Sequence, residues 1–243
     1  MTKFNKILLG KNIKFLATQK GIKVGDIENE VGVSSGYLSR LANEDNKNNF
    51  PIMDLIFLIS NKFEVSINTL LSVDFTSLTP NEILLSKFFD KLSKDTEDSN
   101  IIWELETESK FESCKLHGGH PLFYPEELNN PDTFYYYHSA FDSNVTVAGD
   151  CYKVNVDKNW LYLMCVQKEK TSIKGYELYF VYPQHFNYNY IEPVCKVYQE
   201  SDLYNQINDL RNIAAESSRH VKLSDSVRGT INDYLKKDDG IPF

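Results

Sequence analysis

The fold is decided by Asp26-Ile-Glu-Asn-Glu-Val-Gly-Val-Ser-Ser-Gly-Tyr-Leu-Ser-Arg-Leu-Ala-Asn43, a stretch that predicts two short helices around a tight turn. Ile27 and Val31 stand four positions apart, which places them on one face of the first helix. Gly32 follows directly and supplies the backbone freedom for the chain to leave that helix at a sharp angle. The turn is therefore expected to begin at Gly32.

The second helix of this stretch is expected to begin at Ser34, whose hydroxyl can cap the first turn. Leu38 and Leu41 are three positions apart and form its inward face. A helix, a glycine-containing turn and a capped second helix are the layout of a helix-turn-helix, whose second helix enters the major groove of DNA. The stretch therefore predicts a DNA-recognition unit.

Three further helices are predicted around this pair. The first covers residues 11–19, and a polar loop at 43–49 separates the pair from an apolar helix over 51–62 with a proline at its start. A short helix over 65–71 has Ser66 as its expected cap. Five helices joined by short loops predict a compact all-α domain.

The same residues resemble a known family. Residues 7–75 look like the lambda-repressor-like domain of Cro/cI-type (XRE) helix-turn-helix transcriptional regulators. The pattern runs through Ile13, Gly21, Ile27, Val31-Gly-Val-Ser34, Leu38-Ser-Arg-Leu41, Pro51, Val65-Ser-Ile67 and Leu70-Leu71. The resemblance implies a five-helix DNA-binding domain, which we expect over residues 1–77.

The chain departs from the family pattern at two places. The family usually opens its second helix with Ser-Gln, and a Gln there commonly contacts phosphate, whereas this chain has Lys23-Val24. Lys23 is the candidate replacement for that contact. The family usually has a small Ala where this chain has Glu28, so we expect the two helices to splay slightly or Glu28 to lean outward.

The resemblance also assigns DNA-contacting residues. Ser34, Ser35, Gly36, Tyr37, Ser39 and Arg40 match the contact-bearing positions of the family. Arg40 is the one long donor among them and can bind guanine through two hydrogen bonds or hold a phosphate, while the helix N-terminus can hold a phosphate. Candidate phosphate contacts are Lys11, Lys14, Lys23, Lys47, Asn43 and Asn46. The alternatives are a scaffold or protein-binding helix pair and ordinary solvated lysines.

Charge is distributed unevenly along the chain. The 243 residues carry a net charge of -8, yet the first 50 hold eight Lys or Arg against five Asp or Glu, a net +3. The remaining residues therefore carry -11. Because phosphates attract cations, only the first part of the chain is expected to lie on DNA.

The sequence predicts a soluble cytoplasmic protein with no membrane partner. Its start lacks the apolar segment of a signal peptide, and no run approaches the roughly 20 apolar residues that span a bilayer. Cys114, Cys151, Cys165 and Cys195 are widely spaced and are expected to be free thiols in a reducing compartment.

A linker helix is predicted over residues 78–99. Thr79-Pro-Asn-Glu82 has the form of a capping box, with Thr79 as N-cap, Pro80 at the first helical position and Glu82 at the third. This helix is expected either to link two domains or to form a dimer contact.

The region 100–243 is predicted to be an α+β dimerisation or effector domain with a mainly antiparallel sheet. The expected strands are 101–106, 134–139, 146–148, 151–156, 160–167, 176–182 and 194–198, and the expected helices are 202–216 and 224–236. This region is similar to the tail of some XRE regulators of Firmicutes and their mobile elements. The similarity is carried by Leu78-Thr-Pro-Asn-Glu82, Trp103, His120-Pro-Leu-Phe123, Gly149-Asp-Cys-Tyr152 and Leu161-Tyr-Leu-Met164.

Catalysis and metal binding are disfavoured. Cys114-x-x-His117-x-x-His120, with Cys151 or His138, could supply zinc ligands, but paired Cys-x-x-Cys knuckles are absent and a chance cluster in a loop is favoured. No Gly-x-Ser-x-Gly, phosphate-binding Gly-rich loop or His-Glu-x-x-His occurs, and no Ala-Gly site suggests a self-cleaving repressor. We expect no enzyme activity, catalytic residue, metal or cofactor.

The leading hypothesis is a sequence-specific DNA-binding regulator, a homodimeric repressor that binds a palindromic double-stranded operator in a phage or mobile-element promoter, including its own. The acidic region would dimerise or receive a protein or small-molecule signal. The alternatives are an anti-CRISPR or other anti-defence inhibitor whose acidic domain binds a host protein, and an antitoxin that represses its own operon.

Overall fold

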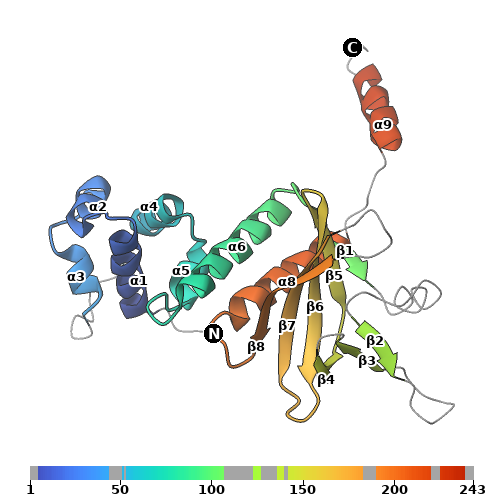
Figure 1. The fold of residues 1–243 in the computed structure, drawn as a ribbon. Helices are drawn as coiled ribbons and strands as arrows, with labels where there is room; N and C mark the ends of the chain where they lie inside the picture. The colour runs from blue at the N-terminus through green and yellow to red at the C-terminus, as the bar shows by residue number, and fades with distance from the viewer. Residues whose placement is uncertain are drawn as a thin grey trace.

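Helices precede a sheet along the chain, as Figure 1 shows. The computed structural model describes residues 5–43, 51, 53–106, 123–126, 136–139, 142–182, 190–219 and 225–238 of the 243. The N-terminal part is helical, and the C-terminal part contains an antiparallel sheet with helices. This layout confirms the predicted α+β class.

Five helices occupy the described residues between 6 and 72: α1 Lys6–Gln19, α2 Val24–Val31, α3 Tyr37–Leu41, α4 Met53–Phe63 and α5 Ile67–Ser72. Helix α1 begins earlier than the expected residue 11, because the side chain of Asn5 caps it by accepting from the backbone N–H of Leu8 at 3.1 Å. Ser66 caps α5 as predicted, accepting from the N–H of Thr69.

Asn12 ties α1 to the segment that follows α5. It is fully buried, and its Nδ2 donates to the carbonyls of Leu70 at 2.9 Å and Val73 at 2.7 Å, while its Oδ1 accepts from the N–H of Phe75 at 3.1 Å. A buried amide must find such partners, because an unpaired polar group is costly away from water. Asn12 therefore bonds to residues 58, 61 and 63 positions further along the chain.

The capping box of α6 (Pro80–Glu97) is present as predicted. Thr79 Oγ1 accepts from the N–H of Glu82 at 3.3 Å, and Glu82 Oε2 accepts from the N–H of Thr79 at 2.8 Å. The hydrogen bond from the Thr79 backbone, with one from its hydroxyl, lowers the pKa of the Glu82 carboxyl. The helix ends at Glu97, two residues before the end of the predicted range 78–99.

The sheet is antiparallel and has eight strands in the described residues: β1 Glu104–Glu106, β2 Phe123–Glu126, β3 Tyr136–Ser139, β4 Asp142–Val147, β5 Cys151–Val156, β6 Asn159–Lys168, β7 Lys174–Tyr182 and β8 Tyr190–Tyr198. Along one edge, β6 pairs with β7 and β7 with β8. Along its other edge, β6 pairs first with β5 and then with β4. Strand β1 pairs with β5. Beyond β4, the sheet is extended by β3, which pairs with β4, and by β2, which pairs with β3.

Strand β2 was not predicted. It contains Pro125, which cannot donate a backbone hydrogen bond and argues against a strand in sequence alone. The strand lies at the end of the sheet order, next to β3 only, and proline is tolerated at such an edge. The bounds of β5 match the prediction, whereas β4 begins four residues before the expected residue 146 and β8 four before residue 194.

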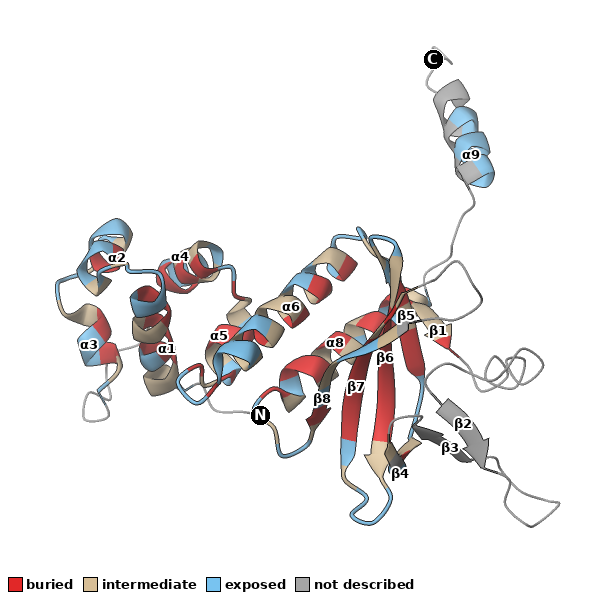
Figure 2. Cartoon of the chain, viewed as in Figure 1, coloured by how far each residue is buried: buried red, intermediate tan, exposed pale blue. Residues whose placement is uncertain are grey.

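Helix α8 (Tyr204–Ser218) lies against one face of the sheet, with α6 beside it (Figure 1). Its Asn208 accepts a 2.6 Å hydrogen bond from the hydroxyl of Tyr176 on β7. The buried residues concentrate between α8 and the central strands and within the N-terminal helices, as Figure 2 shows. Helix α9 (Asp225–Asp238) stands away from both.

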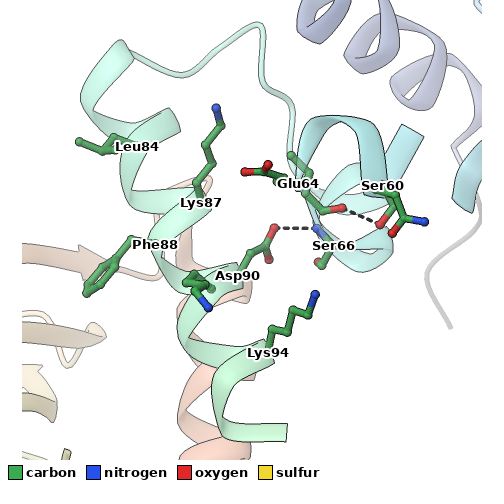
Figure 3. A pocket seen from close by; sticks show the side chains of 11 residues that line it. Ser60, Glu64, Ser66, Leu84, Lys87, Phe88, Asp90 and Lys94 are labelled. Atoms are coloured by element: carbon green, nitrogen blue, oxygen red, sulfur yellow. Dashed lines mark hydrogen bonds between the residues drawn. The ribbon is translucent and has the colours of Figure 1, made fainter. Parts of the chain in front are cut away.

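A partly buried polar cluster joins α5, α6 and α8, and Figure 3 shows the bond between its Asp90 and Ser66. The carboxylate of Asp90 on α6 accepts from the N–H of Ser66 at 2.8 Å, the hydroxyl of Thr69 at 2.7 Å and Nε2 of Gln206 at 3.0 Å. Gln206 belongs to α8 and also donates to the carbonyl of Ser86 at 2.7 Å. The N-terminal helices are therefore attached to the sheet region by directional bonds as well as by apolar contact.

Candidate nucleic-acid interface

The turn between α2 and α3 begins where the sequence predicted it. Gly32 adopts a left-handed conformation with φ of 74°, and its N–H donates to the carbonyl of Asn29 at 3.1 Å. Val33 then donates its N–H to the carbonyl of Glu28 at 2.9 Å. This is the usual way in which a glycine ends a helix, because other residues are strained at positive φ.

Helix α3 does not begin at Ser34. It begins at Tyr37, and its N-cap is Gly36, which is left-handed with φ of 74° and makes no side-chain cap. The expectation that Ser34 caps the helix is wrong, because a second left-handed glycine prolongs the turn by two residues. The caps come instead from a side chain of the preceding helix.

That side chain is Glu28. It is 3 % exposed, its Oε2 accepts from the N–H of Gly36 and its Oε1 accepts from the N–H of Leu38, both at 2.8 Å. Glu28 therefore does not lean outward as one prediction held, but points inward and fastens α2 to the start of α3. A carboxylate is favourable there, since the N–H groups of a helix start carry partial positive charge.

Glu28 also changes what the start of α3 can bind. The sequence predicted that the N-terminal N–H groups of this helix would be open to a DNA phosphate. Two of them, on Gly36 and Leu38, already donate to the Glu28 carboxylate. The carboxylate would repel a phosphate at this position, because like charges repel. Sequence reasoning missed this role, although an acid where the family has Ala was the available signal.

Arg40 lies along the turn. Its Nη2 donates to the hydroxyl of Ser34 at 2.6 Å and its Nη1 to the carbonyl of Ser35 at 3.1 Å. A Cβ at Gly36 would stand 3.3 Å from Nη1, so a larger residue there would crowd the guanidinium. The structure thus brings Ser34, Ser35, Gly36 and Arg40 together on one exposed edge, with Ser39 exposed beside them.

Tyr37 differs from its neighbours. It is half-buried and packs against the apolar core, so part of its ring is used to hold α3 in place. Leu38 and Leu41 are fully buried, as their spacing predicted. Asn43, just after α3, is exposed.

Lysines of α1 lie near the end of α3. Gly10 of α1 faces Ala42, where an added Cβ would come within 2.7 Å of the alanine Cβ, so the two helices touch at this point. Lys14 stands one turn after Gly10 and Lys6 one turn before it, on the same side of the helix. Lys6 was not among the predicted contacts because α1 was expected to start at residue 11. Lys11 is exposed.

The remaining predicted contacts are spread more widely. Lys23 is exposed and is the N-cap residue of α2, where it makes no side-chain cap. Lys47 and Asn46 lie outside the described residues. Lys20 has a structural role, since its Nζ donates to the carbonyl of Lys62 at 2.8 Å at the end of α4.

Within the described residues no group of three or more His, Cys, Asp or Glu side chains could hold a metal ion. Cys114, His117 and His120 lie outside the described residues.

Burial raises the pKa of the Cys151 thiol, whose Sγ accepts from the N–H of Cys165 at 3.4 Å. No helix in the described ranges combines the length and apolarity needed to cross a bilayer.

Comparisons with protein-family models, with curated proteins and with solved structures found no match to this chain.

Proposed function

We propose that the chain is a sequence-specific DNA-binding transcriptional regulator that reads the major groove with α3. The observation that carries the proposal is the pairing of a rigid turn with an exposed polar edge. Glu28 and Gly32 fix the position of α3, while Ser34, Ser35, Ser39 and Arg40 remain at the surface. A recognition element needs both properties, because base contacts require side chains held in register with the groove.

Arg40 is the proposed base-reading residue. In the free chain it bonds to Ser34 and Ser35, and both bonds are exposed. Such bonds contribute about 1 kcal/mol each or less at an exposed site, since water replaces them readily. A bidentate contact to guanine discriminates by about 1–3 kcal/mol. The contact to guanine can therefore offset the loss of the two exposed hydrogen bonds when Arg40 leaves the turn. Its departure also frees the Ser34 hydroxyl for a phosphate or base.

Phosphate contacts are assigned to Lys11, Lys14 and Lys23, with Asn43, around α3. Because the first 50 residues have a net charge of +3, we place the phosphate contacts in this part of the chain. The remaining residues have a net charge of -11, which would repel the phosphates of DNA. Each neutralised phosphate adds about 0.9 to the slope of log affinity against log salt. We therefore expect a shallow salt dependence from each chain.

The proposed active form is a two-fold dimer that represses transcription from a palindromic operator, because two α3 helices related by a two-fold axis read two half-sites about one helical turn apart. A five-residue recognition helix offers few base contacts, so a single copy would bind weakly.

Selection of bound sequences from a randomised duplex library tests this proposal. Enrichment of an inverted repeat by the full chain supports it. A library that stays random after several rounds, with a chain that remains folded by circular dichroism, contradicts it.

A further inference from the structure

Two cysteines meet where β5 begins. Cys151 is the first residue of β5, and Cys165 lies in the neighbouring strand β6. The Sγ of Cys151 accepts from the N–H of Cys165 at 3.4 Å, so the side chain of Cys151 reaches across from one strand to the other. Both thiols are free of disulfide bonds, and the proposed DNA recognition uses neither of them.

The strand register brings these two cysteines within the range of a disulfide. Tyr152 pairs with Leu163. Cys151 therefore stands opposite Met164, one residue before Cys165. Strands about 4.8 Å apart, with a rise of about 3.4 Å per residue, place the two Cα atoms about 6 Å apart. Because disulfides join Cα atoms about 4.4–6.8 Å apart, a bond between these thiols requires no new pairing of the strands.

A cation from α8 lies near this pair. Arg211 is half-buried, and its guanidinium carbon is 5.6 Å from the centroid of the Tyr152 ring, beside Cys151 in the chain. A hydrogen bond from the Cys151 thiol lowers the pKa of the Cys165 thiol, and the guanidinium of Arg211 lowers it further. The thiolate is the nucleophilic form of cysteine, so this environment favours reaction at Cys165.

The two thiols differ in their access to solvent. Cys151 is fully buried, whereas Cys165 is 8 % exposed. Cys165 lies beneath the exposed turn 148–150, where the N–H of Ala148 donates to its carbonyl at 2.9 Å. Gly149 brings no side chain over it, since an added Cβ there would stand 3.8 Å from the Cβ of Cys165. A water-sized reagent can therefore reach Cys165 before it reaches Cys151.

We propose that Cys165 and Cys151 form a site for reversible oxidation by hydrogen peroxide, in which Cys165 is oxidised first and Cys151 closes a disulfide. The Cys165 thiolate attacks one peroxide oxygen, the O–O bond breaks, and the departing hydroxide takes up the proton that the thiol had released. The sulfur of Cys151 then attacks the sulfenic acid, the S–O bond breaks, and the hydroxide leaves as water with the Cys151 proton. The two thiols lose two electrons, and the peroxide is reduced to two waters.

The environments of the two cysteines fit this order. Burial raises the pKa of Cys151, so its thiol stays protonated and supplies the proton of the second step. Such a pair stays reduced in a reducing compartment and closes only when an oxidant is present. This inference goes beyond DNA recognition and does not depend on it, because its tests use the protein without DNA.

Peptide mass spectrometry of the full wild-type chain is the first test. The reduced protein is treated with hydrogen peroxide, alkylated, digested without reductant and compared with untreated protein. We expect a peptide that links Cys151 to Cys165, two hydrogen atoms lighter than the sum of its reduced halves, and more of it than of any link to Cys195. Burial raises the pKa of Cys195 to about 12, which makes it the internal control. Dithiothreitol should reverse the link.

Two variants test the separate roles. In Cys151→Ala the sulfenic acid of Cys165 has no partner thiol, so dimedone should label Cys165 in the folded chain well above Cys195, a preference that urea should abolish. We expect Arg211→Gln to slow oxidation of Cys165 about threefold or more at pH 7, and Arg211→Lys to restore part of the rate, because a nearby cation favours the thiolate. The proposal would be overturned by a folded wild type without the Cys151–Cys165 link, by equal labelling of Cys165 and Cys195, or by an unchanged rate in Arg211→Gln.

Discussion

Glu28→Ala is the most informative single change for the α2–turn–α3 unit (residues 24–41). The carboxylate receives two N–H donors, from Gly36 and Leu38, at 2.8 Å each. Hydrogen bonds to a charged group contribute about 1.5–3 kcal/mol each. The N–H of Gly36 is only partly buried, so water can replace its partner, whereas the N–H of Leu38 is buried. We therefore expect a loss of about 2–4 kcal/mol in the free energy of unfolding of the helical region.

The assay combines urea unfolding with amide hydrogen exchange. Exchange at Leu38 should accelerate most, because its N–H loses its acceptor, and unfolding of the helices should shift to lower urea. Glu28→Gln keeps one good acceptor and should fall between the wild type and Glu28→Ala. Glu30→Ala is the matched control, since Glu30 is exposed and its 2.6 Å ion pair with Lys62 should contribute less than about 1 kcal/mol.

A Glu28→Ala chain as stable as Glu30→Ala would contradict the stabilising role of Glu28. Unchanged exchange at Leu38 would contradict it as well, because the hydrogen bond from Leu38 to the carboxylate would then not protect that N–H.

Two further substitutions and one labelling experiment test other parts of the fold. Asn12→Ala removes three buried hydrogen bonds and should cost about 3 kcal/mol or more in thermal or urea unfolding, whereas a loss below about 1 kcal/mol would show that water replaces the amide. Thr79→Ala should cost about 1 kcal/mol at pH 7. Hydrogen bonds from Thr79 lower the Glu82 pKa below its ordinary 4.5, so their stabilisation is present above that value and disappears as the pH falls through the folded pKa. The difference between wild type and Thr79→Ala should therefore shrink in acid, and a constant difference down to pH 2 would contradict this linkage. Burial raises the pKa of Cys195 to about 12, so its labelling by iodoacetamide at pH 8 should be far slower in the native chain than in urea, as peptide mass spectrometry can measure. Equal rates would mean that the thiol is open to solvent.

Features with local causes could be predicted from sequence. The capping box of α6 needs only Thr79, Pro80 and Glu82 in order, and Gly32 and Ser66 act on their immediate neighbours. Strand β5 alternates along its own length and its bounds were predicted correctly. Such signals are readable because the interacting groups lie within one helical turn or one strand of each other.

Features with distant causes were missed. Glu28 caps α3 from another helix, and nothing in the residues around Ser34 shows that Gly36 will take a left-handed conformation. Asn12 has partners almost sixty residues away. Along one edge, β6 pairs with β5 over its first part and with β4 over its last part. The sequence of a single strand does not show which strands it will pair with. In the candidate site, Ser34, Ser35, Ser39 and Arg40 are exposed, whereas the inward position of the Glu28 carboxylate was not predicted as the cap of α3.

We propose that α3 reads base sequence through Arg40. The most direct measurement is the ratio of Kd values for a scrambled duplex and for the selected operator, compared for the wild type, Arg40→Ala and the control Arg219→Ala, an exposed arginine at the end of α8. We expect Arg40→Ala to lower this ratio about 5- to 150-fold, the equivalent of about 1–3 kcal/mol, and Arg219→Ala to preserve it. An unchanged ratio in Arg40→Ala would contradict base reading by Arg40.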